Sequence, residues 1–132
     1  MILNYCKING VAFDVTVSIS DYEESFNVLD GQNAGRVMAG TMIRDIIGTY
    51  IGHKITFFNN GNISAFDALW DYLVAHSVDD SVALEAADGQ SSIEYQAYYT
   101  SGTRRLKRAS GGENFWDELD VNFIPMDARV RP

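Results

Sequence analysis

A strict alternation of apolar and polar side chains over residues 11–20 is the feature that most constrains how this chain can fold. Successive side chains of a strand point to opposite faces, so the alternation gathers the large apolar residues on one face, which a helix cannot do. A half-buried strand is therefore predicted here. The preceding Asn9 and Gly10 tolerate the positive φ of a tight hairpin turn, so residues 2–8 are expected to form the partner strand.

Strand signals recur in four later segments. β-branched and aromatic residues dominate the first of them, and the other three alternate between apolar and polar side chains. Asp88 and Gly89, a strong signal for a two-residue hairpin turn, lie between the second and the third. The four segments are residues 50–58, 82–86, 93–99 and 115–124.

One amphipathic helix is predicted at about residues 64–76. Its large apolar side chains recur at helical spacing and form one stripe, opposite a polar face. Ser64, followed three positions later by Asp67, resembles a capping box at the start of a helix. We expect the stripe to cover one face of a sheet. The stripe consists of Phe66, Leu69, Trp70, Leu73 and Val74.

Residues 21–49 follow neither the helical nor the strand period. A connection of that length is unusual in a compact domain, and such loops tend to be functional or to be ordered by a partner. The segment carries too many large apolar residues to remain in water. It is therefore predicted to be a long loop that packs on its own domain or on another chain.

Together these elements predict a β-rich α+β fold, an antiparallel β-sandwich or barrel-like sheet with one flanking helix and one long loop. A chain of 132 residues, 46% hydrophobic and 21% charged, fits one globular domain over residues 1–132. No stretch of the sequence reaches the roughly 18 consecutive apolar residues of a membrane helix. The N-terminus also lacks the basic segment followed by an apolar one that is typical of a signal peptide. We expect a protein that is made in a cytoplasm and kept there until it assembles, with no membrane partner.

The net charge of −8 disfavours direct binding of DNA by the chain as a whole, because phosphate binding depends on clustered Lys and Arg. One basic cluster lies between two flexible segments, residues 100–103 and 109–112. It is expected to be a solvated turn or a contact to an acidic neighbouring subunit, since no stacking aromatic residue is interleaved with it. The cluster consists of Arg104, Arg105, Lys107 and Arg108.

The sequence predicts no catalytic residue, no cofactor and no metal site, so an enzyme is not expected. Cys6 has no second cysteine, and neither His53 nor His76 has a neighbour at ligand spacing. The motifs of serine nucleophiles, phosphate loops and calcium loops are missing from the sequence. Several aromatic residues could stack on sugar rings, although packing within the sheet is the favoured interpretation. These residues are Tyr95, Tyr98, Tyr99, Phe115 and Trp116.

Several short motifs resemble small tail proteins of phages and prophages. The most specific are Gly35-Arg36, Gly40-Thr41-Met42 and Arg44-Asp45, and residues 116–124 at the end of the chain also fit. The resemblance implies the tail-tube-like fold shared by tail tube, distal-tail and baseplate hub proteins, which are not enzymes. In that fold a β-sandwich carries a helix on its flank, and a long loop reaches the adjacent subunit.

The resemblance also implies a virion structural protein of the tail or baseplate, made in the cytoplasm of a bacterial host. Its partners would be copies of itself in a ring or tube, hexameric by the resemblance, and adjacent tail or baseplate proteins. The chain is too short for the second domain of a distal-tail protein. Two alternatives remain: a non-catalytic β-sandwich module that binds a glycan or receptor, and a head-tail connector or tail completion protein.

Within this family interpretation, the long loop and the basic cluster supply the contacts between subunits. The alternative is that Arg44 and Asp45 are an ordinary surface pair and that Ile46 and Ile47 are the end of a strand. The expected polar contacts are Arg36, Arg44 and Asp45, joined by Arg104, Arg105, Lys107 and Arg108 of the basic cluster. The expected apolar contacts are Met38, Met42, Ile43, Ile46 and Ile47.

Overall fold

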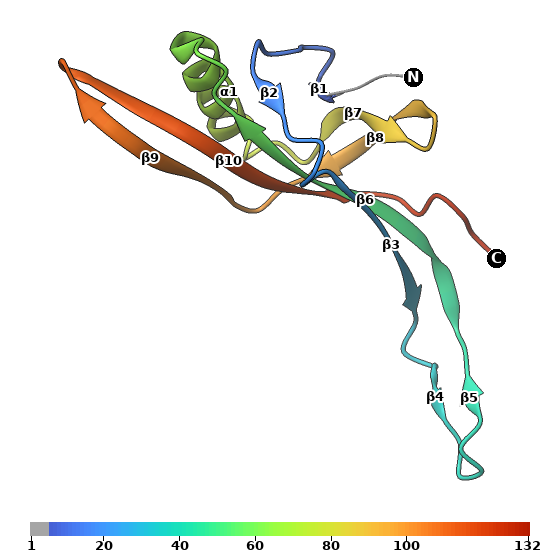
Figure 1. Ribbon diagram of the computed structural model, residues 1–132. Helices are drawn as coiled ribbons and strands as arrows, with labels where there is room; N and C mark the ends of the chain where they lie inside the picture. The colour runs from blue at the N-terminus through green and yellow to red at the C-terminus, as the bar shows by residue number, and fades with distance from the viewer. Residues whose placement is uncertain (1–5) are drawn as a thin grey trace.

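The structure is a computed structural model that describes residues 6–132, in which ten strands and one helix are found (Figure 1). The first five strands are β1 (Cys6–Ile8), β2 (Thr16–Val17), β3 (Glu23–Asp30), β4 (Gly35–Arg36) and β5 (Met42–Ile43). Strand β6 (Ile46–Phe58) precedes helix α1 (Ile63–Ala75). The last four strands are β7 (Val82–Asp88), β8 (Ser91–Tyr98), β9 (Gly102–Ser110) and β10 (Glu113–Pro125).

Six strands form a nearly closed, barrel-like antiparallel sheet in the order β1-β7-β8-β10-β6-β2. Helix α1 lies against this sheet, so the predicted β-rich α+β fold with one helix is confirmed, in its barrel-like form. The helix and the sheet bury one core between them. Its members are Ile8, Val17, Ile55, Phe57, Phe66, Leu69, Leu73, Val82, Leu84, Ala86, Ala97, Leu119, Val121 and Phe123.

Two strands extend well beyond the barrel. β6 and β10 have 13 residues each, yet they pair with each other only between residues 53–57 and 119–123. Residues 46–54 of β6 pair with β3, and residues 113–121 of β10 pair with β9. Two long ribbons therefore project from the barrel toward opposite sides of Figure 1.

The strand predicted over residues 11–20 is wrong except at Thr16 and Val17. β3 pairs with the same edge of β6 as β2 does. The other residues of 11–20 therefore have no strand edge to pair with. The predicted turn at Asn9 and Gly10 does form, with φ of 52° and 78°, but it closes only the single bridge between Ile8 and Val11. β1 pairs instead with β7, and the part of its predicted strand before Cys6 lies outside the described residues.

The long loop predicted over residues 21–49 is also wrong, because most of this segment is a β-hairpin. β3 pairs with β6 along its whole length, and β4 with β5 closer to the tip. Alternation in a sequence arises when one face of a strand is buried and the other is solvated. Neither face of this hairpin is buried in its own chain, so the sequence carries no period there.

The basic cluster, predicted to be a solvated turn, lies in strand β9. β9 forms a hairpin with β10 whose turn lies at residues 111–112. The predicted hairpin of β7 and β8 across Asp88 and Gly89 is confirmed, and so is the final strand.

The predicted helix is confirmed to within one residue at each end, and its cap differs. The Asn62 side chain, not that of Ser64, accepts the free N–H of Ala65 at 3.2 Å. Of the apolar stripe, Phe66, Leu69 and Leu73 are buried, Trp70 is half-buried, and Val74 is 54% exposed. Within residues 6–132 no helix is long and apolar enough to cross a membrane.

Because Phe66 is fully buried, Phe66→Ala is expected to lower the free energy of unfolding by about 3–5 kcal/mol. Val74→Ala on the exposed side of the same helix should change it by less than about 0.5 kcal/mol. Urea denaturation of both variants measures the difference. Equal losses would mean that the helix packs with a different face.

Candidate subunit interface

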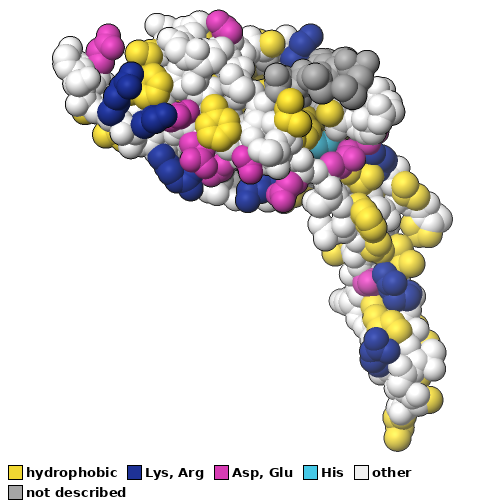
Figure 2. Space-filling model, viewed as in Figure 1, with side chains coloured by type: hydrophobic (Ala, Val, Ile, Leu, Met, Phe, Trp, Pro, Cys, Tyr) yellow, Lys and Arg dark blue, Asp and Glu magenta, His cyan; other side chains and the backbone are white. Residues whose placement is uncertain are grey.

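The hairpin of residues 23–47, here called the arm, is an exposed apolar surface (Figure 2). Nine large apolar side chains within it are between 38% and 107% exposed. Consecutive pairs such as Val28 and Leu29 point to opposite faces of the ribbon and are both exposed, so neither face is covered by its own chain. They are Phe26, Val28, Leu29, Val37, Met38, Met42, Ile43, Ile46 and Ile47.

The predicted polar contacts of the arm hold it together within one copy. The Arg44 Nε lies 2.8 Å from Asp30 Oδ1, and this hydrogen bond holds the pKa of Asp30 below its usual value. Arg36 donates to the Gly40 carbonyl at 2.9 Å, near the tip. Asp45 accepts the Gly31 N–H through its backbone carbonyl at 2.6 Å. Arg36 and Arg44 remain exposed while they make these contacts, so a role for them between subunits stays a prediction.

Arg104 lies between two indole rings. Its guanidinium carbon is 4.5 Å from the ring centroid of Trp70 and 4.4 Å from that of Trp116. One guanidinium nitrogen also lies 3.2 Å from Asp67 Oδ1. Stacking of this kind is attractive because the ring faces carry negative charge density. Arg104 therefore fixes α1 to the β9–β10 ribbon.

The other basic side chains of β9 contact β10 of the same hairpin. Arg105 lies 3.1 Å from carboxylate oxygens of Glu118 and Asp120. Lys107 lies 3.7 Å from Asp117, and Arg108 stacks on Phe115 at 4.7 Å. Eight of the predicted interface residues, those between residues 36 and 47, thus lie on the arm. The other four, the basic residues of β9, lie on the β9–β10 ribbon.

A buried histidine lies where the arm leaves the barrel. The His53 side chain is 0% exposed, and its Nε2 is 2.9 Å from the Ala87 carbonyl and 3.2 Å from Glu24 Oε2. Because a carbonyl only accepts, Nε2 carries the proton and Nδ1 accepts from the Tyr95 hydroxyl at 2.6 Å. Burial lowers the pKa of His53, so the ring is neutral near pH 7.

Charged side chains from three separate segments, Glu24, Asp88 and Arg129, lie around His53. Burial raises the pKa of Glu24 on β3, and so does the hydrogen bond that its protonated carboxyl donates to the Asp88 carboxylate. The guanidinium of Arg129, from the C-terminal segment, lies 3.3 Å from Asp88 Oδ1. The backbone N–H of Arg129 also donates to the Thr49 carbonyl of β6 at 2.8 Å. These contacts make a polar cluster that fixes the direction of the arm.

Sequence reasoning missed this cluster, which we call the root cluster. Its members come from β3, β6, the β7–β8 hairpin and the C-terminal segment, so no local spacing links them. A histidine in the middle of an apolar strand was the one signal available. The cluster consists of Glu24, His53, Asp88, Tyr95 and Arg129.

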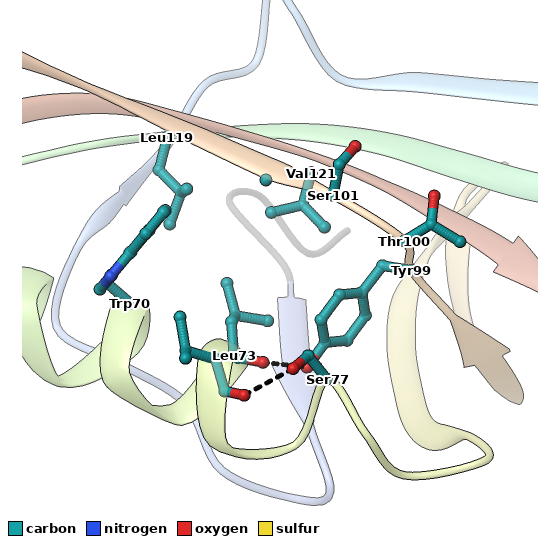
Figure 3. A pocket seen from close by; sticks show the side chains of 10 residues that line it. Trp70, Leu73, Ser77, Tyr99, Thr100, Ser101, Leu119 and Val121 are labelled. Carbon is teal, nitrogen blue, oxygen red and sulfur yellow. Dashed lines mark hydrogen bonds between the residues drawn. The ribbon is translucent and has the colours of Figure 1, made fainter.

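The aromatic residues considered as a sugar platform are dispersed. Tyr95 lies beside His53, and Phe115 and Trp116 lie beneath the arginines of β9. Tyr99 borders a cavity of about 130 Å³ between α1 and β10, where its hydroxyl donates to the Leu73 carbonyl at 2.6 Å (Figure 3). Packing within the fold, the favoured interpretation, accounts for these four side chains, whereas Tyr98 is 36% exposed.

The lowered pKa of His53 makes stability depend on pH. The unfolded chain takes up a proton near pH 6.5, whereas the folded protein does so only at lower pH. Stability should therefore fall as the pH drops below about 6.5, until the pH reaches the folded pKa. His53→Gln should flatten this decrease between pH 6.5 and 5.5 in urea denaturation. His76→Gln, at the half-buried C-cap of α1, is the control, and equal slopes for wild type and His53→Gln would contradict the assignment.

Among residues 6–132 no group of three or more His, Cys, Asp or Glu side chains is placed to hold a metal ion. The chemically distinctive features of the described chain are therefore the apolar arm, its root cluster and the arginine-rich ribbon. No protein-family model matches the chain, and no curated protein matches its sequence.

Proposed function

We propose that this protein is a structural subunit of a phage-type tail or baseplate, which assembles with copies of itself into a ring or tube. The observation that carries the proposal is the arm. A two-stranded ribbon is marginally stable in water by itself, and contiguous exposed apolar surface marks sites of protein contact. An arm with nine exposed apolar side chains fits a chain that completes its fold against a neighbour.

The open edges of two strands support assembly into a ring. β3 pairs only with β6 and β9 only with β10, and within residues 6–132 neither strand makes another backbone hydrogen bond. The two strands lie at opposite ends of the strand order β9-β10-β6-β3, so each has one unpaired edge. Neighbouring strands in this order are antiparallel, so the first and the fourth, β9 and β3, run in opposite directions. β9 of the next copy would therefore lie antiparallel to β3. Two different edges that meet in this way generate a ring when the rotation closes.

The charges of the two edge strands favour the same pairing. β3 contains Glu23, Glu24 and Asp30 and no basic residue, whereas β9 contains four basic residues and no acidic one. Opposite charges across an interface increase the rate of encounter and select the register. The ion pairs within each ribbon reduce this effect, so the backbone and the apolar arm supply most of the affinity.

Serine substitutions on the arm test the proposal. Ile43→Ser combined with Ile46→Ser removes two exposed apolar side chains, so it should leave the monomer folded and abolish assembly. Sedimentation velocity and negative-stain electron microscopy measure the assembled fraction, and circular dichroism checks the fold.

Val11→Ser combined with Ile19→Ser is the matched control. These residues are 41% and 62% exposed and lie outside the arm, so this variant should assemble like the wild type. A wild-type protein that stays monomeric at high concentration would contradict the proposal, and so would normal rings from the arm variant.

A further inference from the structure

The tip of the arm presents one methionine on a well-defined turn. The Val37 N–H donates to the Thr41 carbonyl at 2.9 Å, and the Gly40 N–H donates to the Val37 carbonyl at 2.8 Å. Gly40 has a φ of 84°, the left-handed conformation that ends a three-residue hairpin loop. The Arg36 guanidinium donates to the Gly40 carbonyl and braces this turn. Met38 stands at its apex and is fully exposed.

The cavity between α1 and β10 is the right kind of site for such a side chain. It measures about 130 Å³ and is lined mainly by apolar groups of α1, β10 and the β8–β9 connection (Figure 3). Pockets for drug-sized ligands measure roughly 300–1,000 Å³, so this one suits a single side chain. Trp70 and Tyr99 line it together with the two serines Ser77 and Ser101.

We propose that Met38 of one copy inserts into the α1–β10 cavity of a neighbouring copy. This inference rests on the proposed function, since it names the surface that receives the arm. A methionine side chain is flexible, and its sulfur makes favourable contacts with aromatic rings such as those of Trp70 and Tyr99. The arm projects from the barrel away from α1, so the Met38 of the same copy does not reach this cavity.

Charge favours the same pairing. Residues 31–43, which form the outer arm, contain one arginine, Arg36, and no acidic residue. Residues 63–80, which include α1 and the turn after it, contain four aspartates and no lysine or arginine. Burial, and then the nearby Asp79 carboxylate, raise the pKa of the Tyr99 hydroxyl, which lines the cavity. Asp67 is paired with Arg104 and Asp79 with His76, so the remaining negative charge of this segment adds a weak attraction for a positively charged tip.

Cysteine cross-linking tests the contact directly. Met38→Cys and Ser77→Cys proteins are mixed, assembled and mildly oxidised, and a disulfide-linked dimer should form in the mixture in excess of either protein alone. Wild type is the control for disulfides through Cys6, the one native cysteine, whose thiol pKa burial raises to about 12.

A substitution gives a second readout on the full chain. Met38→Asp should weaken assembly about tenfold to a hundredfold in sedimentation velocity, because a buried methionine contributes that much affinity. Ala39→Asp, one position along the same exposed turn, places the same charge outside the cavity and should weaken assembly much less.

Normal wild-type rings, with no preferential cross-link and an unaffected Met38→Asp variant, would overturn the Met38 contact and leave the proposed function standing. A wild type that never assembles would overturn both.

Discussion

The short pairing between β6 and β10 determines the rest of this structure. Five residue pairs, from Phe57 with Leu119 to His53 with Phe123, join two strands of 13 residues each. Their inward side chains are the centre of the core, so the register cannot shift without turning apolar groups toward water. Because only five residues of each strand take part in this pairing, both strands extend beyond the barrel. The extension of β6 forms part of the arm, and the extension of β10 forms part of the arginine-rich ribbon.

The arm keeps a defined direction because polar contacts hold its base. His53 is fully buried at the branch point, and Glu24, Asp88 and Arg129 close over it from three separate segments. Close packing contributes as well, since a Cβ added to Gly48 would lie 2.6 Å from Ala128 of the C-terminal segment. The outer arm has no such support. The protein therefore combines a fixed base with an apolar end that its own core leaves uncovered.

Sequence reasoning succeeded for elements that pair in the sheet or pack on it with one face buried, and failed for the arm, where neither face is buried. It also failed at residues 11–20, where the alternation is strict but only Thr16 and Val17 pair with another strand. The runs at residues 82–86 and 93–99 alternate because β7 and β8 face the core, and α1 shows its period for the same reason. The arm is exposed on both faces, so its strands carry no period and were predicted to be a loop. Its apolar residues still indicated a contact with another chain, which stays a prediction. The root cluster was invisible because four distant segments build it.

Hydrogen exchange along the arm tests the central claim most directly, namely that a neighbouring copy covers it. The account predicts rapid exchange of the outer-arm amides, residues 31–43, in the monomer and exchange slower by about tenfold or more in the assembly. Amides around Ile55 and Val121, in the β6–β10 pairing, should be protected in both states. Equal exchange of the outer-arm amides in the two states would contradict the account.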